Sequence, residues 1–548
     1  MNVLKVHPAD NVLVALESLP PGAAIPYDGQ TYTLPKRVAA KHKFVTQALS
    51  PGDAVYMYGV LVGKATQPIA RGAPITPANV AHASQSYGTQ QGAYIWTAPD
   101  VSHWENRSFL GYHRSDGQVG TANHWLVIPL VFCENRNVAL LKDAFEKELG
   151  YAQPGIYQNQ VAELASLYRQ GKSAEALRQV RRSEAKPDAV HRPLFPNVDG
   201  IKFLTHEGGC GGTRQDARGL CGLLAGYINN PNVAGATILS LGCQNAQIEM
   251  LREALAARNP NFDKPLLIFE QQRSRSEYDM LSEAIQQTFV GMVEANTLDR
   301  QPAPLGHLTM GVECGGSDGF SGLSANPAIG HAADLLVALG GTVILSEFPE
   351  LCGVEQELIN RCVSPEVADR FARIMQTYAA QAEAVGSGFD MNPTPGNIRD
   401  GLITDAIKSA GAAKKGGTSP VTAVLGYPEY ATEKGLNLLC TPGNDVESTT
   451  GMAGAGANVM LFSTGLGTPT GNPITPVLKI STNTDLATRM PDLIDLDSGP
   501  IIRGEKTIEQ VGKDLLEMVI EVASGVYTPK AVRLGQNDFI PWKRGVSL

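Results

Sequence analysis

The feature that most constrains this chain is the alternation, from about residue 107 onward, of short apolar runs with amphipathic segments. The run NHWLVIPLVFC precedes VALLKDAFEKEL, ATILSLGC precedes AQIEMLREALAAR, and HLTMGVEC opens a similar series from about residue 303. Apolar strands that alternate with amphipathic helices form largely parallel sheets covered by helices on both faces. The sequence therefore predicts an α/β fold for most of the chain.

The first 85 residues follow a different pattern. Short β-like runs such as NVLVAL and DAVYMYGVLVGKAT alternate with turns, which predicts a small all-β domain over residues 1–85. Residues 86–106 lack an apolar period and are predicted to be a linker. Because 548 residues exceed what one hydrophobic core organises, we expect two α/β domains after the linker, over residues 107–300 and 301–548.

Composition narrows the class of protein. A hydrophobic content of 43% with 18% charged residues predicts a globular protein, and the net charge of −9 argues against a nucleic-acid partner. The N-terminus lacks the pattern of a secretory signal, and no apolar run reaches the ~18 residues of a membrane span. We therefore expect a cytoplasmic protein with no membrane partner. The sequence is compatible with a homo-oligomer.

Polar, glycine-rich loops follow several predicted strands. THEGGCGGTRQD follows IKFL, ECGGSDGFSG follows HLTMGV, and SEFPE follows GTVIL. Ligands of parallel sheets bind at the carboxyl ends of the strands, and such loops suit carboxylate or phosphate groups. The dinucleotide, P-loop and HExxH zinc motifs do not occur in a suitable context. The pattern favours a small anionic ligand.

Three of the eight cysteines lie in these loops: Cys210, Cys243 and Cys314. Soft thiolates select iron, copper or zinc, so one hypothesis is an iron centre with an open position, either a single ferrous ion or an iron–sulfur cluster. The alternative is that small residues are needed where a strand meets a helix. No CxxC pair occurs, so we predict no disulfide framework.

Longer segments carry a family resemblance. In order along the chain they are GYHRSDGQVGTAN (111–123), THEGGCGG (205–212), LGCQNAQ (241–247), CGGSDGFSGLSANPAIG (314–330), SEFPELCGVE (346–355), IKSAGAAKKGGTSP (407–420) and PGNDVESTTG (442–451). They resemble the altronate/galactarate dehydratase family over nearly the whole chain, and residues 1–85 are similar to its SAF (β-clip) domain. The resemblance implies a hydro-lyase that converts six-carbon sugar acids to 2-keto-3-deoxy acids. It points most closely to altronate dehydration in galacturonate catabolism, with iron, or manganese in its place, as the cofactor.

The chemistry of dehydration assigns roles to the candidate residues. Removing water beside a carboxylate requires a base for the C2 proton, stabilisation of the enediolate, and an acid for the departing C3 hydroxyl. The expected catalytic residues are His206, Asp318, Glu347 and Lys408. The expected sugar-acid contacts are His42, Arg114, Asp116, Arg214, Ser317, Asn326, Glu350, Asn397, Asn444 and Asp445, and the expected metal ligands are Cys210, Cys243 and Cys314.

Structural interpretations compete with several of these roles. Asp318 in GSDG fits an Asx turn or a helix cap, His206 fits a core histidine, Arg114 and Asp116 fit a surface turn, and Lys408 fits a solvated helix face.

Departures from the family pattern limit the choice of substrate. They lie at Met57, Thr76, Ala78, Asn230, Gln244, Gln356, Ala406 and Ile407. Three hypotheses follow: an altronate dehydratase, a related lyase acting on galactarate or a sulfonated hydroxy acid, and an inactive sugar-acid binding or regulatory protein.

Overall fold

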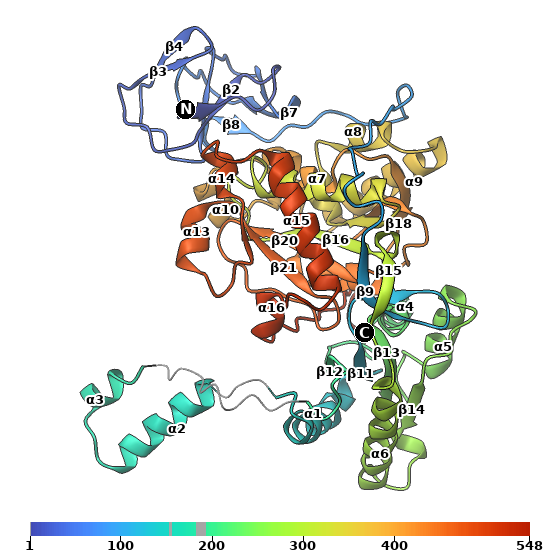
Figure 1. The fold of residues 1–548 in the computed structure, drawn as a ribbon. Helices are drawn as coiled ribbons and strands as arrows, with labels where there is room; N and C mark the ends of the chain where they lie inside the picture. The colour runs from blue at the N-terminus through green and yellow to red at the C-terminus, as the bar shows by residue number, and fades with distance from the viewer. Residues whose placement is uncertain (1, 153–155, 182–192) are drawn as a thin grey trace.

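A computed structural model describes residues 2–152, 156–181 and 193–548, so the predicted ranges 1–85 and 107–300 each include residues outside the description. The chain forms a β-rich N-terminal domain, a middle α/β domain and a larger C-terminal α/β domain (Figure 1). Both α/β sheets are entirely parallel, which confirms the predicted fold class. No helix in the described part of the chain is both long and apolar enough to cross a membrane.

The N-terminal domain consists of short antiparallel strands. They are β1 (Val3–Leu4), β2 (Val12–Ala15), β3 (Ala24–Tyr27), β4 (Gln30–Thr33), β5 (Lys43–Val45), β6 (Ala54–Met57), β7 (Val60–Ala65) and β8 (Val80–Ala81). Alternate residues of β2 face opposite sides, as in any strand. Leu13 packs into the domain's own core, whereas Val12 and Val14 pack into a core shared with the C-terminal domain. The N-terminal domain therefore packs against the C-terminal domain through side chains of its own strand β2.

Residues 86–106 contain no helix or strand, and they lie along the C-terminal domain. The Tyr94 hydroxyl donates to the Thr418 carbonyl oxygen at 2.6 Å, and the Trp96 indole donates to the Thr418 hydroxyl at 3.1 Å. Trp104 is buried and donates to Glu517 at 2.7 Å. The segment predicted as a linker is a packed connection.

The middle domain is built on a four-stranded parallel sheet in the order β12-β11-β13-β14. Its strands are β11 (His124–Pro129), β12 (Gly200–Phe203), β13 (Val233–Ser240) and β14 (Leu266–Glu270). Its helices are α1 (Asn135–Leu149), α2 (Ile156–Arg169), α3 (Ala174–Arg178), α4 (Arg214–Asn229), α5 (Ile248–Arg258) and α6 (Glu277–Ala295). Trp125 and Val127 pack with α1 and α6, whereas Leu126 and Ile128 pack with α4 and α5, so helices cover both faces. Figure 1 shows α2 and α3 projecting away from this sheet.

A small antiparallel sheet joins the two ends of the middle domain. It comprises β9 (Ser108–His113), β10 (Val119–Gly120) and β15 (Gln301–Pro304), in the order β10-β9-β15. The chain therefore enters and leaves the middle domain through neighbouring strands.

The C-terminal domain contains a seven-stranded parallel sheet in the order β18-β19-β17-β16-β20-β21-β22. Its strands are β16 (Thr309–Cys314), β17 (Thr342–Leu345), β18 (Val421–Leu425), β19 (Gly435–Leu439), β20 (Val459–Thr464), β21 (Val477–Ser481) and β22 (Leu496–Asp497). Its helices are α7 (Ala325–Ala338), α8 (Glu355–Asn360), α9 (Pro365–Glu383), α10 (Pro395–Arg399), α11 (Asp405–Ala412), α12 (Asp445–Gly454), α13 (Thr484–Arg489), α14 (Gly499–Ile502), α15 (Ile508–Ala523) and α16 (Lys530–Arg533), with short 3-10 helices η5 (Phe348–Leu351) and η7 (Ala413–Gly416).

The two α/β domains share a hydrophobic core. Along β20, Val459 and Leu461 pack with α7 and α15, whereas Met460 and Phe462 pack with α12 and with α4 of the middle domain. Where α4 meets α12, a Cβ on Gly226 would overlap the carbonyl oxygen of Gly454. The C-terminal residues also return to the middle domain, where the Leu548 N–H donates to the Gly211 carbonyl oxygen at 2.8 Å. These contacts fix the relation between the two sheets.

Candidate active site

Buried acids, lysines and a thiol meet at the carboxyl edge of the C-terminal sheet. Glu313 and Cys314 are the last two residues of β16, and Glu347 and Glu350 follow β17. Because β16 and β17 are parallel neighbours, their ends reach the same edge. Lys408 comes from α11 and Lys415 comes from η7. Both elements pack on this edge of the sheet.

Lys415 links Glu347 to Cys314. Its ammonium group lies 3.1 Å from Glu347 Oε2 and 3.0 Å from Cys314 Sγ, and both Lys415 and Glu347 are almost fully buried. Glu347 has a left-handed backbone with φ 64°, which is uncommon for a residue with a side chain and concentrates at functional sites. The Thr441 hydroxyl accepts the Glu347 N–H at 2.9 Å and helps to hold this conformation.

Lys408 pairs with Glu350. Its ammonium group lies 2.5 Å from Glu350 Oε1 and 2.5 Å from the Asn392 side-chain oxygen. The other oxygen of Glu350 lies 3.6 Å from Cys314 Sγ, so the two lysine pairs meet at the thiol.

A fourth carboxyl group, that of Asp445, connects this cluster to the surface. Asp445, the first residue of α12, is half-buried, whereas Glu313 is fully buried and accepts a hydrogen bond from the Ser448 hydroxyl. Carboxylate oxygens of Glu313, Glu347 and Asp445 lie within 4.8 Å of one another.

The surroundings of Glu347 and Glu350 drive their pKa values apart. Burial raises the pKa of Glu347 well above its usual range, and the nearby Glu313 and Glu350 raise it further. Burial also disfavours the charged form of Glu350, but the two lysines outweigh it and lower the pKa. The site therefore favours the protonated form of Glu347 and the ionised form of Glu350, the arrangement that separates an acid from a base.

The remaining groups of the cluster are also perturbed. Burial raises the pKa of Asp445 to about 7, with further contributions from Glu313 and Glu350. Burial raises the pKa of Cys314 to about 11, so this thiol is protonated at neutral pH. Burial disfavours charge on Lys408, but Glu350 outweighs it and raises the pKa of the ammonium group.

The three cysteines expected to share a metal do not come together. Among the described residues that form groups of metal-ligating atoms, Cys314 lies with Glu347 and Glu350, while Cys210 and Cys243 belong to no group. The physical reason is that Cys210 and Cys243 follow β12 and β13 of the middle sheet, whereas Cys314 ends β16 of the C-terminal sheet. Both of the former are exposed, and the three thiols form no common group among the described residues.

The carboxyl cluster offers a different set of metal ligands. Glu313 and Asp445 repel each other, and the Oε1 atom of Glu347 has no hydrogen-bond partner among the described residues. A divalent cation would relieve both conditions. Oxygen donors beside a thiol suit a ferrous or manganous ion, so the residues fit the expected cofactor.

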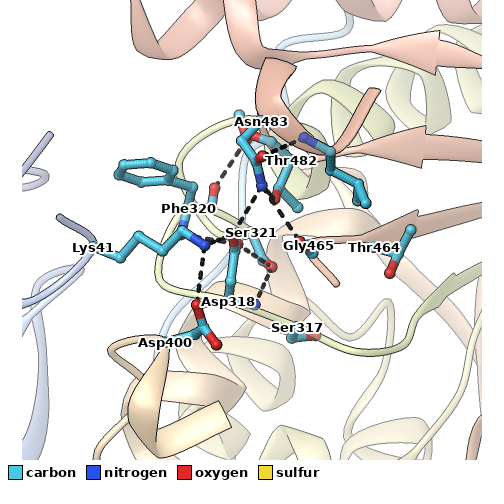
Figure 2. A network of polar contacts seen from close by, with 12 residues as sticks. Lys41, Ser317, Asp318, Phe320, Ser321, Asp400, Thr464, Gly465, Thr482 and Asn483 are labelled. Carbon is cyan, nitrogen blue, oxygen red and sulfur yellow. Dashed lines mark hydrogen bonds and ion pairs between the residues drawn. The ribbon is translucent and has the colours of Figure 1, made fainter. Parts of the chain in front are cut away.

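Asp318 lies in a separate network between domains. Figure 2 shows the Lys41 ammonium group between Asp318 and Asp400, at 2.9 Å and 3.1 Å. The Asp318 carboxylate also accepts from the Ser321 hydroxyl, from the Phe320 N–H and from the Asn483 side chain (Figure 2). Since Lys41 belongs to the N-terminal domain, this network holds two domains together.

Other predicted residues contact the backbone. His42 contacts the Arg399 carbonyl oxygen at 3.0 Å. Both ring nitrogens of His206 contact backbone groups, those of Pro129 and Gly208, and burial lowers its pKa to about 4. Arg114 is buried and donates to the Pro231 carbonyl oxygen at 2.8 Å. These contacts are those of structural side chains.

The polar residues at other strand and helix ends have similar partners. Asp116 accepts from Gln118 and Asn259, Arg214 is exposed at the start of α4, and Asn326 donates to the Gly411 carbonyl oxygen. Asn397 completes the capping box of α10 with Thr394, and Asn444 is the N-cap of α12. The Ser317 carbonyl oxygen accepts from Asn397, and its buried hydroxyl has no partner among the described residues. None of these contacts joins the residue to the Glu347 cluster.

A cavity away from this cluster lies between the middle domain and the C-terminal tail. Its volume is about 580 Å³, and its lining includes His206, Cys210, Glu447, Trp542 and Lys543. His206 and Cys210 therefore line the same cavity, and this cavity is not part of the carboxyl cluster.

The sequence interpretation missed Lys415 and Glu313. The sequence contains a signal for Glu313, because an acid inside the apolar run HLTMGVEC requires a buried partner or a function. It contains little signal for Lys415, since the two lysines in AAKKGG look alike and only the fold buries the second.

An α/β protein with three domains, whose larger sheet ends in buried acids of divergent pKa beside lysines, belongs to the enzymes equipped for acid–base chemistry. The comparisons with known proteins give the family. The D-galactarate/altronate dehydratase C-terminal region matches residues 305–547, the D-galactarate dehydratase/altronate hydrolase second domain matches 111–296, and the altronate/galactarate dehydratase SAF domain matches 1–83. The chain belongs to the altronate/galactarate dehydratase family.

Individual relatives agree with this assignment. The chain is 32% identical to altronate dehydratase of Escherichia coli (strain K12) over the whole of both chains. It is 31% identical to altronate dehydratase of Bacillus subtilis (strain 168), over 100% of this chain and 99% of the relative. It is also 35% identical to galactarate dehydratase (L-threo-forming) of Escherichia coli (strain K12), over 54% of this chain and 57% of that protein.

Proposed function

We propose that this protein is a hydro-lyase that converts D-altronate to 2-keto-3-deoxy-D-gluconate and water in galacturonate catabolism. The observation that carries the proposal is the pair Glu347 and Glu350, whose pKa values are shifted in opposite directions between two buried lysines. Relatives that are altronate dehydratases over their full length support the choice of substrate.

The residues of the cluster divide the steps of the reaction between them. Glu350 takes the C2 proton, and the electron pair of that C–H bond moves onto the carboxylate to give the enediolate. The pair then forms the C2–C3 double bond as the C3–O bond breaks, and Glu347 gives its proton to the departing hydroxyl, which leaves as water. The enol product takes a proton from solvent at C3 and loses the proton of its C2 hydroxyl, which gives the 2-keto-3-deoxy acid.

Lys408 and Lys415 supply positive charge where the reaction builds negative charge. Both are buried, and each already lies within hydrogen-bonding distance of a carboxylate. A substrate carboxylate at this place would accept hydrogen bonds from the same ammonium groups. These bonds would strengthen as negative charge builds up on the carboxylate in the enediolate.

Glu313 and Asp445 are the residues that we propose would hold a ferrous or manganous ion beside Glu347. Such an ion, when bound, supplies Lewis-acid stabilisation to a substrate carboxylate and hydroxyl. Asp445 is half-buried, so this end of the cluster is the one that a substrate can approach from solvent.

A substrate panel tests the proposal. Purified protein is incubated with D-altronate, galactarate or sulfolactate, with added ferrous or manganous ion, and 2-keto-3-deoxy acid, or sulfite from sulfolactate, is measured. We expect turnover of altronate. Turnover of galactarate or sulfolactate instead would favour a related lyase, and tight binding without turnover of any acid would favour a binding protein.

Variants test the assignment of the acid and the base. Glu347→Gln and Glu350→Gln should each lower kcat by about 100-fold or more, the usual contribution of a proton-transfer group. Glu357→Gln, in which an exposed carboxylate of α8 is changed, is the matched control and should retain full activity. Unchanged kcat in either active-site variant would remove that residue from the mechanism.

A further inference from the structure

A second group of metal-ligating side chains lies where the N-terminal domain leads into the C-terminal domain. His82 directly follows β8, Cys352 directly follows η5, and Asp405 is the first residue of α11. The ligand atoms of these three residues all lie within 4.8 Å of one another, and none of the three belongs to the carboxyl cluster described above.

The Asp405 carboxylate is incompletely satisfied. The residue is fully buried, and its Oδ2 atom has no hydrogen-bond partner in the described part of the chain. Its Oδ1 atom accepts a long contact, 3.4 Å, from the Ser409 hydroxyl, and the Cys352 thiol, a weak donor, is its other side-chain partner. A buried carboxylate oxygen without a full hydrogen-bond donor destabilises the folded protein. A cation at Asp405 would remove this destabilisation.

The three side chains offer nitrogen, sulfur and oxygen, and this mixture selects the class of ion. Calcium and magnesium take oxygen ligands, whereas an imidazole and a thiolate together favour zinc or ferrous iron. Cys352 is only 8% exposed, and its Sγ atom lies 4.0 Å from His82 Nε2, so an ion fits between them with modest movement. We propose that His82, Cys352 and Asp405 form a binding site for one divalent ion of the zinc or ferrous class.

The tautomer of His82 is part of this proposal. The Ala406 N–H contacts Nδ1 of His82 at 3.4 Å, the long limit of a hydrogen bond. Binding through Nε2 places the ring proton on Nδ1 and ends this weak contact. The exchange replaces one long hydrogen bond with a metal–nitrogen bond.

The site lies on the same elements as the proposed catalytic pair. Cys352 comes two residues after Glu350, and Asp405 comes three residues before Lys408 in α11. A bound ion would therefore join the connection leaving the N-terminal domain to the two segments that hold Glu350 and Lys408 at 2.5 Å. The inferred role is positioning, and metal binding itself does not depend on the proposed function.

Cobalt binding tests the site directly. The full chain is stripped of metal with a chelator and titrated with Co²⁺ under anaerobic conditions, and thiolate-to-cobalt absorption is followed in the near ultraviolet. We expect this band in the unmodified protein and its loss in Cys352→Ser. His82→Asn and Asp405→Asn should weaken Co²⁺ binding at least about tenfold, and Zn²⁺ should displace the band.

Two cysteine variants serve as controls. Cys362→Ser changes a buried thiol that contacts only a backbone oxygen, and Cys314→Ser changes the thiol of the carboxyl cluster. Both should retain the band. A band absent from the unmodified protein, or lost in Cys314→Ser and kept in Cys352→Ser, would overturn the proposal.

Circular dichroism and thermal unfolding establish that each variant is folded. If Cys352→Ser does not fold, the half-buried His82 decides the question, because unchanged Co²⁺ affinity in folded His82→Asn would overturn the site. Since the readout is absorption and affinity, a failed metal site and a failed dehydratase assay are distinguishable.

Discussion

At the scale of single residues, Lys415 is the buried cation that contacts both Glu347 and Cys314. Lys415→Met keeps most of the side-chain length but removes the charge, which leaves buried polar groups without their partner. We expect a loss of about 1 to 3 kcal/mol in the free energy of unfolding, because the buried Glu347 carboxyl and Cys314 thiol lose their hydrogen-bond partner. We also expect a fall in kcat of about 100-fold, measured on altronate.

The neighbouring lysine provides the control for this experiment. Lys414→Met changes a half-buried side chain outside the cluster and should alter neither quantity by much. Equal effects from the two substitutions would show that Lys415 has no special place in the site.

Asp445 makes stability depend on pH. Its pKa rises from 3.8 to about 7 on folding, so the folded protein binds more protons than the unfolded chain between these values. Stability from this group is therefore present below about pH 4 and is lost as the pH rises toward 7. Asp445→Asn removes this loss of stability at high pH. We expect the variant to melt at a higher temperature than the unmodified protein at pH 8 but not at pH 4.

The size of this effect has an upper limit of about 4 kcal/mol, since one pKa unit corresponds to about 1.4 kcal/mol. Asp492→Asn, at an exposed carboxylate, is the control and should not change the pH dependence of melting. A pH profile that is the same for Asp445→Asn and the unmodified protein would contradict the raised pKa.

At the scale of elements, the packing of α4 against α12 depends on a glycine. A Cβ at Gly226 would overlap the Gly454 carbonyl oxygen, so the two helices must move apart to accommodate alanine. We expect Gly226→Ala to lower the free energy of unfolding by about 1 to 3 kcal/mol, as overpacking does in other cores. Denaturant unfolding measures the change.

Gly219 in the same helix is the matched control. A Cβ there meets no atom within 4 Å, so Gly219→Ala should be neutral or stabilise the protein by about 0.5 to 1 kcal/mol through helix propensity. If both substitutions had the same effect, the close approach of α4 and α12 would not explain the sensitivity of Gly226.

The elements were predictable where a local pattern determines them. The run HLTMGVEC predicted β16, and the alternation of its neighbours predicted the parallel sheet, because period and composition are properties of a few consecutive residues. The contact between Glu347 and Lys415 was not predictable in this way, since it joins residues 68 positions apart. The left-handed backbone of Glu347 likewise depends on a hydrogen bond to Thr441 from another strand end.

At the scale of the whole molecule, the sequence located the polar strand ends but not the sheet to which each belongs. Cys210, Cys243 and Cys314 occur in similar loops, yet two of these loops end strands of the middle sheet and the third ends a strand of the C-terminal sheet. Which ends meet depends on how two domains dock, and that depends on surfaces such as the one around Gly226. Glu347, Glu350, Lys408 and Asp445 lie close together because their three segments all belong to the C-terminal domain.

The docking of the N-terminal domain supplies a last prediction. Burial disfavours charge on Lys41, but Asp318 and Asp400 outweigh it and raise its pKa, so the ammonium group bridges the two domains. Lys41→Met should lower the free energy of unfolding by about 1 to 3 kcal/mol, since the buried Asp318 loses its ionic partner and keeps its hydrogen bonds. It should also speed proteolysis within residues 1–85, whereas Lys36→Met, at an exposed position, should not.

The same variant separates the two interpretations of Asp318. If Asp318 serves the domain junction, Lys41→Met lowers stability while kcat on altronate stays within about threefold, because the Glu347 cluster does not include this carboxylate. If Asp318 is a proton-transfer group, Lys41→Met lowers kcat on altronate well beyond threefold. Such a fall in kcat, without a loss of stability, would return Asp318 to the active site.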